Sequence, residues 1–298
     1  MNQQFQWAIW RLMLSTLMLL FVSSKIGLAQ EIDQQNLPIQ ERLYGTQNLV
    51  AWCIVPFDAS RRGPAERAKM VKKLGINRIA YDWRAEHVPT FEEEIIQYQK
   101  NGIEFFAFWS WHDSLEALVA KYKIRPQIWV TLASPAVDQE ADRVRIAADS
   151  LMPLAEKTQR LGLKLALYNH GGWGGRPMSL VKVCEVLRER TNSDHVGIVY
   201  NFHHAHDDTK EFTESLPQLV PYLFCLNLNG MVDSHEVKTQ NKKIVPIGSG
   251  KYELAMMKSV LTSGYRGPVG ILDHRNDLDA RESLQQNLDG LSQLIENW

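Results

Sequence analysis

The sequence is poor in cysteine, which excludes a fold held together by a disulfide framework. Its three cysteines, Cys53, Cys184 and Cys225, are odd in number and lie inside apolar runs rather than in turns. We therefore expect buried thiols that pack as small hydrophobic side chains. Neither cysteine nor histidine occurs at a zinc-finger spacing.

An excess of charge of either sign is also missing. The 33 Lys and Arg residues nearly balance the 34 Asp and Glu residues, and the basic residues form no stripe. Because nucleic-acid binding depends on neutralising phosphates with Lys and Arg, nucleic acid is not an expected partner. The sequence also lacks a Gly-x-Gly-x-x-Gly fingerprint after a strand and a phosphate-binding loop.

Long hydrophobic runs are absent beyond the N-terminus. Arg11 precedes an apolar run over residues 12–22, and Gly27 and Ala29 then provide the small residues that a signal peptidase accepts. We predict a signal peptide over residues 1–29, and therefore export to a periplasm or secretion. The alternative is an uncleaved anchor, but the run is shorter than the roughly 20 residues of a membrane span. No second run of this kind occurs, so we expect no span in the mature protein.

The remaining chain alternates short apolar runs with amphipathic helical patterns, which is typical of parallel βαβ units. The runs are continuously apolar, as expected of strands covered on both sides: Leu49–Val55, Arg78–Tyr81, Phe105–Trp109, Gln127–Thr131, Leu165–Tyr168, Gly197–Tyr200, Leu223–Leu228 and Val269–Leu272. We predict an N-terminal extension over 30–46 and one α/β domain, a (β/α)8 TIM barrel, over 47–298. An open doubly wound sheet is the alternative.

The residues that follow the predicted strands are mostly polar, and in a parallel barrel such residues meet around one mouth. A single strand-end histidine is usually structural, but convergence of many polar groups favours a shared active site. The catalytic candidates are His170, His204, Asp273, Arg84 and Asp82. The two histidines and Asp273 are candidate bases, and Arg84 is a candidate for stabilising an oxyanion.

Aromatic and amide side chains at the same strand ends predict a small sugar-like ligand, because aromatic faces stack on sugar rings and amides bond to hydroxyls. The substrate-binding candidates are Trp109, Trp111, His112, Asn169, Trp173, Asn201, His203, Asn227, Asn229 and His274. Nothing in the sequence indicates an oligomeric state.

Two glycine-rich stretches allow functional interpretations. Gly171–Gly175 is either a flexible loop or a lid over the substrate. Gly248–Gly250 precedes a predicted helix near Glu253, where backbone amides can hold an anion, although turns of this kind are common.

Several of these segments resemble the xylose isomerase-like barrel superfamily, which includes sugar isomerases and epimerases, inosose dehydratases and endonuclease IV-type repair enzymes. The resemblance extends from Leu49 to about Leu294. It is carried by Leu165–His170, Val196–Asn201 with His204, Pro246–Gly250 and Gly267–Ile271.

The resemblance implies a divalent metal, which typical members hold with Glu, Asp, His and Glu after strands five to eight. The matching positions here are Tyr168, Asn201, Asn227 and Asp273, of which only the last is a carboxylate. Because hard cations prefer charged oxygen ligands, this chain is expected to be a divergent member. An alternative site for zinc would use nitrogen ligands; its candidates are His170, His204 and His274, with Asp273.

The resemblance favours an exported sugar isomerase or epimerase that transfers a proton next to a sugar carbonyl. The second hypothesis is a lyase or dehydratase on keto sugars or glycosides, which begins with the same proton abstraction. The third is a sugar-binding barrel without catalysis, motivated by the missing carboxylates. A DNA repair role fits least, given the predicted export and the absent basic face.

Overall fold

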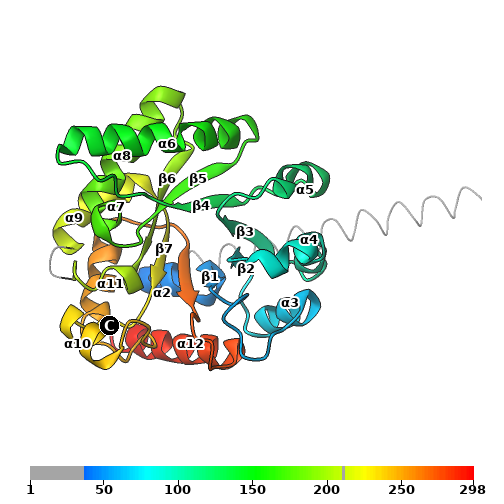
Figure 1. Ribbon diagram of the computed structural model, residues 1–298. Helices are drawn as coiled ribbons and strands as arrows, with labels where there is room; N and C mark the ends of the chain where they lie inside the picture. Colours follow the sequence, from blue (N-terminus) through cyan, green and yellow to red (C-terminus); the bar gives the residue numbers. More distant parts are fainter. Residues whose placement is uncertain (1–36, 210–211) are drawn as a thin grey trace, which may run out of the picture. The chain divides into compact units, whose positions relative to one another are not determined.

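The structure of this chain is a computed structural model that describes residues 37–209 and 212–298 (Figure 1). The predicted signal peptide, residues 1–29, lies outside the described residues, as does most of the predicted extension. Residues 43–298 form one compact unit. None of the helices described has the length and apolar character that crossing a membrane requires.

Eight parallel strands close into a barrel, in which each strand pairs with the next and the last pairs with the first. The strands are β1 (Leu49–Trp52), β2 (Arg78–Tyr81), β3 (Glu104–Trp109), β4 (Gln127–Thr131), β5 (Lys164–Tyr168), β6 (Val196–Asn201), β7 (Leu223–Leu228) and β8 (Val269–Leu272). The predicted (β/α)8 barrel is confirmed, and the open doubly wound sheet is excluded because β1 and β8 are hydrogen-bonded neighbours.

One strand is shorter than predicted. The apolar run suggests that β1 continues to Val55, but it ends at Trp52. The reason is Cys53, whose φ of 58° lies in the left-handed region, which a strand cannot include. The chain therefore turns away from the sheet at this residue.

Helices follow the strands and surround the barrel (Figure 1). The α-helices are α2 (Ile39–Tyr44), α3 (Pro64–Lys73), α4 (Phe91–Lys100), α5 (Ser114–Tyr122), α6 (Glu140–Arg160), α7 (Gly172–Gly175), α8 (Pro177–Thr191), α9 (Phe212–Leu219), α10 (Ser234–Gln240), α11 (Glu253–Thr262) and α12 (Ala280–Glu296). Short 3-10 helices are η1 (Thr46–Asn48), η2 (Ala85–Thr90), η3 (Phe202–His204) and η4 (Val220–Tyr222).

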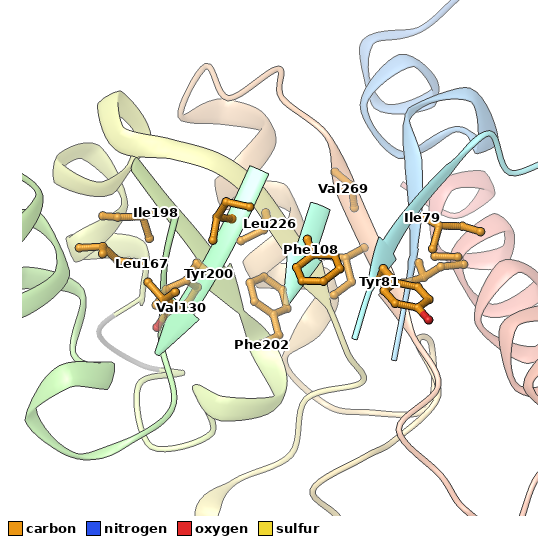
Figure 2. Close-up of a cluster of buried hydrophobic side chains, with 14 of the residues drawn as sticks. Ile79, Tyr81, Phe108, Val130, Leu167, Ile198, Tyr200, Phe202, Leu226 and Val269 are labelled. Carbon is orange, nitrogen blue, oxygen red and sulfur yellow. The ribbon is translucent and has the colours of Figure 1, made fainter. Parts of the chain in front are cut away.

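The barrel has two apolar regions, because successive side chains of a strand point to opposite faces of the sheet. The outward-facing side chains pack against the helices, and ten residues of this outer core are labelled in Figure 2. The inward-facing side chains form a separate cluster, the interior cluster, which includes Trp52, Trp129, Tyr168 and Val199. All three cysteines are free and buried, which confirms that prediction.

Candidate active site

Polar and aromatic side chains from five strand ends, those of β1, β2, β5, β6 and β8, lie close together at the carboxyl end of the barrel. They sit above the interior cluster, because the inward-facing positions of β1, β2, β5 and β6 point into the barrel. We call this group the mouth cluster, and it consists of Cys53, Asp82, Tyr168, His170, His203, His204 and His274.

Four histidines from three strand ends are in mutual contact in this cluster. The ring centres of His203 and His204 are 3.9 Å apart, and His170 lies 4.4 Å from His204. His274, after β8, lies 5.5 Å from His203. The Tyr168 hydroxyl is 3.4 Å from Nε2 of His203. The histidines that follow β5, β6 and β8 thus lie together, as the sequence predicts.

The environment keeps these imidazoles neutral at pH 7. Burial is the main cause in each case: it lowers the pKa of His203 far below its usual value, that of His204 to about 2 and that of His274 to about 4. The pKa of His170 is also lowered, by partial burial and then by the charge of Lys243. His170 is the exposed member of the four, so its ring is the one that burial affects least.

Asp82 brings a second kind of titratable group to the mouth. It follows β2, is 1% exposed, and lies close enough to Cys53 to raise the pKa of that thiol. Its Oδ1 accepts one long bond, 3.3 Å, from the backbone N–H of Val55, and its Oδ2 has no partner among the described residues. Burial raises the pKa of Asp82 to about 8, so the carboxyl is mostly protonated at pH 7.

Two residues of the cluster have left-handed backbone conformations. The φ angles of Cys53 and His274 are 58° and 56°, and Sγ of Cys53 lies 3.4 Å from Nδ1 of His274. The His274 ring stacks on Phe57 at 4.1 Å between ring centres. Such conformations in residues other than glycine persist only where the surroundings impose them, and they are common at functional sites.

An amide ladder joins three neighbouring strand ends beside the histidines. Asn169 Oδ1 accepts from the backbone N–H of Asn201 at 2.7 Å, and Asn227 Nδ2 donates to Asn201 Oδ1 at 2.5 Å. Gly270 makes room for Asn227, because a Cβ at that position would lie 1.7 Å from Asn227 Oδ1. All three amides are fully buried, so they hold the strand ends together rather than facing solvent.

Asp273 does not join the histidines. In β8 the inward-facing end residue is Leu272, which belongs to the interior cluster. The Asp273 carboxyl lies beside Ser283 of α12, Arg275 and Asp58, and its charge also raises the pKa of Cys53, but no contact joins it to the histidines among the described residues. Burial raises its pKa to about 7. The alternation of side chains along a strand accounts for the difference from the sequence-based expectation.

The predicted groups Arg84 and Trp109 lie beside the cluster. Trp109 packs 4.7 Å from Tyr168 and 5.8 Å from Trp52, between ring centres. Arg84 is exposed, and its Nη1 donates to the backbone carbonyls of Asp82 and Trp83. Its guanidinium is therefore held at the edge of the mouth.

Other predicted binding residues lie elsewhere. Trp111 donates to Asp113 at 3.0 Å, and His112 is held by Ser114 and packs against Trp83. Asn229 is 1% exposed, and its amide is bonded to backbone atoms of residues 230, 243 and 245. No contact joins these three side chains to the mouth histidines within the described part of the chain.

The glycine-rich stretch after β5 is packed rather than open. It forms the short helix α7, and Trp173 lies in the outer core and donates to Glu140 at 2.7 Å. Gly174 approaches Leu132 so closely that a Cβ would lie 2.2 Å from the Leu132 carbonyl oxygen. Neither the flexible-loop nor the lid interpretation fits this packing, and Trp173 does not face the mouth.

The predicted anion site at Gly248–Gly250 is filled by a carboxylate of the chain itself. Glu253, 2% exposed, accepts from the backbone N–H of Gly250 at 2.7 Å and of Gly248 at 3.1 Å. Its other oxygen accepts from Met231 N at 2.9 Å. These amides are therefore not available to a phosphate, and the prediction of a ligand site here is corrected.

The four positions at which the resemblance places metal ligands do not fit a divalent cation. Burial raises the pKa of Tyr168 well above its usual value, so the phenol stays protonated. Asn201 and Asn227 use their amides on each other, and Asp273 faces α12. The histidines of the alternative zinc set lie in one cluster but are not arranged around a common point: within residues 37–209 and 212–298, no three His, Cys, Asp or Glu side chains are placed to hold a metal ion.

Two residues of the site escaped the sequence analysis. Cys53 sits inside an apolar run, and only its left-handed conformation reveals its place in the mouth. Lys243 lies in the segment after α10, outside any strand end, yet its charge lowers the pKa of all four mouth histidines. No motif or periodicity marks either residue.

The chain belongs to the xylose isomerase-like TIM barrel family, whose model matches residues 116–294. This confirms the resemblance inferred from the strand-end segments. A search of curated proteins found no match.

Solved structures share the fold at low sequence identity. A 3-keto-D-glucoside 4-epimerase from E. coli is 16% identical, with a TM-score of 0.60 over 84% of this chain and 99% of that one. The IOLI protein with a binding zinc atom is 16% identical, with a TM-score of 0.64 over 85% and 99%. A probable 3-DHS dehydratase from Bacillus anthracis is 14% identical, with a TM-score of 0.62 over 82% and 98%.

Proposed function

We propose that this chain transfers a proton next to the carbonyl of a sugar, and so isomerises or epimerises it. The observation that carries the proposal is the mouth cluster, which combines neutral imidazoles with a protonated, partly unbonded carboxyl. Proton transfer of this kind needs a base and a donor for the oxyanion that forms. Related structures include a keto-sugar epimerase.

His170 is the proposed base. It is the exposed imidazole of the four and is neutral at pH 7, so it can accept a proton from a carbon next to a carbonyl. His204, 4.4 Å away, does not compete for this proton, because its pKa is about 2. Isomerisation results when the proton returns to the former carbonyl carbon while the adjacent hydroxyl loses its proton and becomes the new carbonyl. Epimerisation results when the original carbon takes a proton from solvent on the opposite face, and His170 then gives its proton to solvent.

Asp82 is the proposed oxyanion donor. As the proton leaves carbon, the electron pair moves to the carbonyl oxygen, which needs a hydrogen-bond donor. A protonated carboxyl with a pKa of about 8 supplies one without a metal ion. The four positions that hold a metal ion in typical family members do not fit a cation here. The proposal therefore assigns stabilisation of the oxyanion to Asp82.

A hydrogen-exchange experiment tests this function. The purified protein is incubated in deuterated water with 3-keto sugars, ketoses and aldoses, with and without chelator, and exchange at carbon is followed by NMR. We expect exchange that persists with chelator and falls by about 10²–10⁴-fold in His170→Ala. His235→Ala, an exposed histidine on α10, is the control that keeps wild-type exchange. Absence of exchange by the wild type on every substrate contradicts the proposal, as does undiminished exchange in His170→Ala.

A dehydratase is the second candidate, favoured by the same protonated carboxyl. After proton abstraction, Asp82 would give its proton to a departing hydroxyl, and water would leave. A probable dehydratase shares the fold. Product masses separate the two reactions, because an isomer keeps the mass of the substrate and an elimination product loses water. Ligand binding without turnover would support the non-catalytic sugar-binding barrel.

We further propose that the protein acts outside the cytoplasm, on the basis of residues 1–29. Cell fractionation and N-terminal sequencing of the mature protein test this. Export with cleavage near Ala29 is the expected result, and an intact N-terminus on cytoplasmic protein contradicts it.

A further inference from the structure

Lys243 is a half-buried cation without a counter-ion. Its ammonium makes no ion pair or hydrogen bond with any residue that the structure describes, and burial lowers its pKa. Its neighbour Lys242 is exposed and pairs with Glu236 at 3.1 Å. An unpaired, partly buried charge is costly, whereas an exposed ion pair is nearly neutral for stability. Lys243 therefore lacks the anionic partner that Lys242 has in Glu236.

The position of Lys243 is fixed by buried side chains. Its backbone carbonyl lies 3.0 Å from Nε2 of His206 and 3.0 Å from Nδ2 of Asn229. The N–H of Val245 donates to Oδ1 of Asn229, and Ile244 packs against the interior cluster. The segment that carries Lys243 is thus held against the end of the barrel, and the lysine is not on a free loop.

Lys243 stands at the end of the barrel that carries the mouth cluster, because its carbonyl lies 3.0 Å from Nε2 of His206, two residues after His204, and the adjacent Ile244 packs against the interior cluster. In agreement with this position, like-charge repulsion from Lys243 lowers the pKa of His170, His204 and His274. The carboxyl that could compensate it, Asp82, is mostly protonated at pH 7. The mouth consequently carries a positive charge that no described side chain neutralises.

We propose that Lys243 binds the carboxylate of an acidic sugar, so that the substrate class of this site is a sugar acid rather than a neutral sugar. The inference rests on the proposed function, because it takes the ligand to be a sugar. A carboxylate can accept from the Lys243 ammonium with neutral imidazoles as further donors, and the Arg84 guanidinium at the edge of the mouth adds to the attraction of an anion. A phosphate is the less suitable anion, because the backbone amides at Gly248–Gly250 are already bonded to Glu253.

Calorimetric titration tests the proposal with matched ligands. The full mature protein is titrated with glucuronate and galacturonate, with glucose and galactose, and with glucose 6-phosphate. We expect the two acids to bind at least about tenfold more tightly than the neutral sugars, a difference of about 1.4 kcal/mol. Equal affinity for glucose and glucuronate overturns the proposal, and so does tighter binding of glucose 6-phosphate.

Two neighbouring substitutions supply the matched control. Lys243→Gln is expected to weaken glucuronate binding by about tenfold or more and to leave glucose binding unchanged. Lys242→Gln is expected to change neither, and Lys243→Arg to restore part of the affinity. Unchanged glucuronate binding in Lys243→Gln overturns the proposal. Thermal unfolding of each variant verifies that the fold is intact.

The outcomes separate this proposal from the proposed function. Binding of acidic sugars that depends on Lys243, without carbon exchange, contradicts the proton-transfer function and supports the anion site. Exchange on neutral keto sugars, without preference for acids, contradicts the anion site and supports the proton-transfer function.

Discussion

Two buried carboxyl groups near the carboxyl end of the barrel differ in their surroundings. Glu253 is 2% exposed and accepts three bonds from backbone amides of 2.7 to 3.1 Å. Asp82 is 1% exposed, accepts one bond of 3.3 Å, and leaves an oxygen without a partner among the described residues. A satisfied buried carboxylate stabilises a fold, whereas an unsatisfied one is costly and is retained for another reason. The comparison assigns Glu253 to structure. Asp273 also leaves its oxygens without a hydrogen-bond partner among the described residues, so the assignment of Asp82 to function rests in addition on its place beside Cys53 and Tyr168 in the mouth cluster.

The largest effect expected from this comparison is the loss of exchange in Asp82→Asn. The amide has the same size, but its N–H is a far weaker acid than a carboxyl O–H and cannot transfer a proton to the oxyanion, so we expect carbon exchange to fall by about 10²–10⁴-fold. Circular dichroism and urea unfolding should show a fold at least as stable as the wild type. Wild-type exchange rates in this variant would remove Asp82 from the chemistry.

The next expected effect is the contribution of Asp82 to the pH dependence of stability, which decreases as the pH rises. The pKa of Asp82 is about 8 in the folded protein against 3.8 as the reference value, so the folded state binds more protons between these values. The stabilisation is fully present below pH 3.8 and is lost as the pH rises through about 8. At about 1.4 kcal/mol per pKa unit, this contribution is on the order of 6 kcal/mol.

Urea unfolding of the wild type and of Asp82→Asn across this range measures the effect. The slopes of the two proteins should differ by the contribution of Asp82. The contribution of Asp273, whose pKa is raised to about 7, and the opposite contribution of the four histidines, whose pKa values are lowered, should be the same in both. Parallel pH profiles of the two proteins would show that Asp82 is not protonated in the fold.

Glu253→Gln should act on stability alone. The substitution replaces a charged acceptor by an amide that turns an N–H group toward backbone donors, so we expect a loss of about 2–4 kcal/mol. Exchange per folded molecule should equal that of the wild type. A stable variant with impaired exchange would reverse the roles that the comparison assigns.

The smallest effect is expected for Asp273→Asn. This carboxyl faces α12 rather than the mouth histidines, so exchange should change by less than about threefold. Kinetics on the best substrate of the panel measure this difference. A loss as large as that of Asp82→Asn would show that Asp273 reaches the substrate.

The fold could be predicted from the sequence because buried parallel strands are continuous apolar runs, and most predicted strands match within one or two residues. The exception, β1, ends where Cys53 adopts a left-handed conformation that tertiary contacts impose. The convergence of His170, His203, His204 and His274 could also be predicted, since strand ends meet by topology.

Other parts of the site depend on the directions of side chains and on contacts between distant parts of the chain, which the spacing of residues in the sequence does not predict. The direction of Asp273 depends on the exact residue at which β8 stops alternating. Trp111 lies in a loop and Trp173 in the four-residue helix α7, and neither segment is long enough for a period to indicate which side its aromatic ring faces. Lys243 reaches the mouth through a segment held by His206 and Asn229, a contact between distant parts of the chain.

The amide ladder has a consequence for how the site responds to its medium. Asn169, Asn201 and Asn227 carry no ionisable group, so the bonds that tie three strand ends together are the same in acid and in base. A carboxylate at any of these places would change its bonding with every proton gained or lost. The three strand ends beside the histidines therefore keep the same hydrogen bonds at every pH, and a change of pH alters only the charges of the titratable groups next to them.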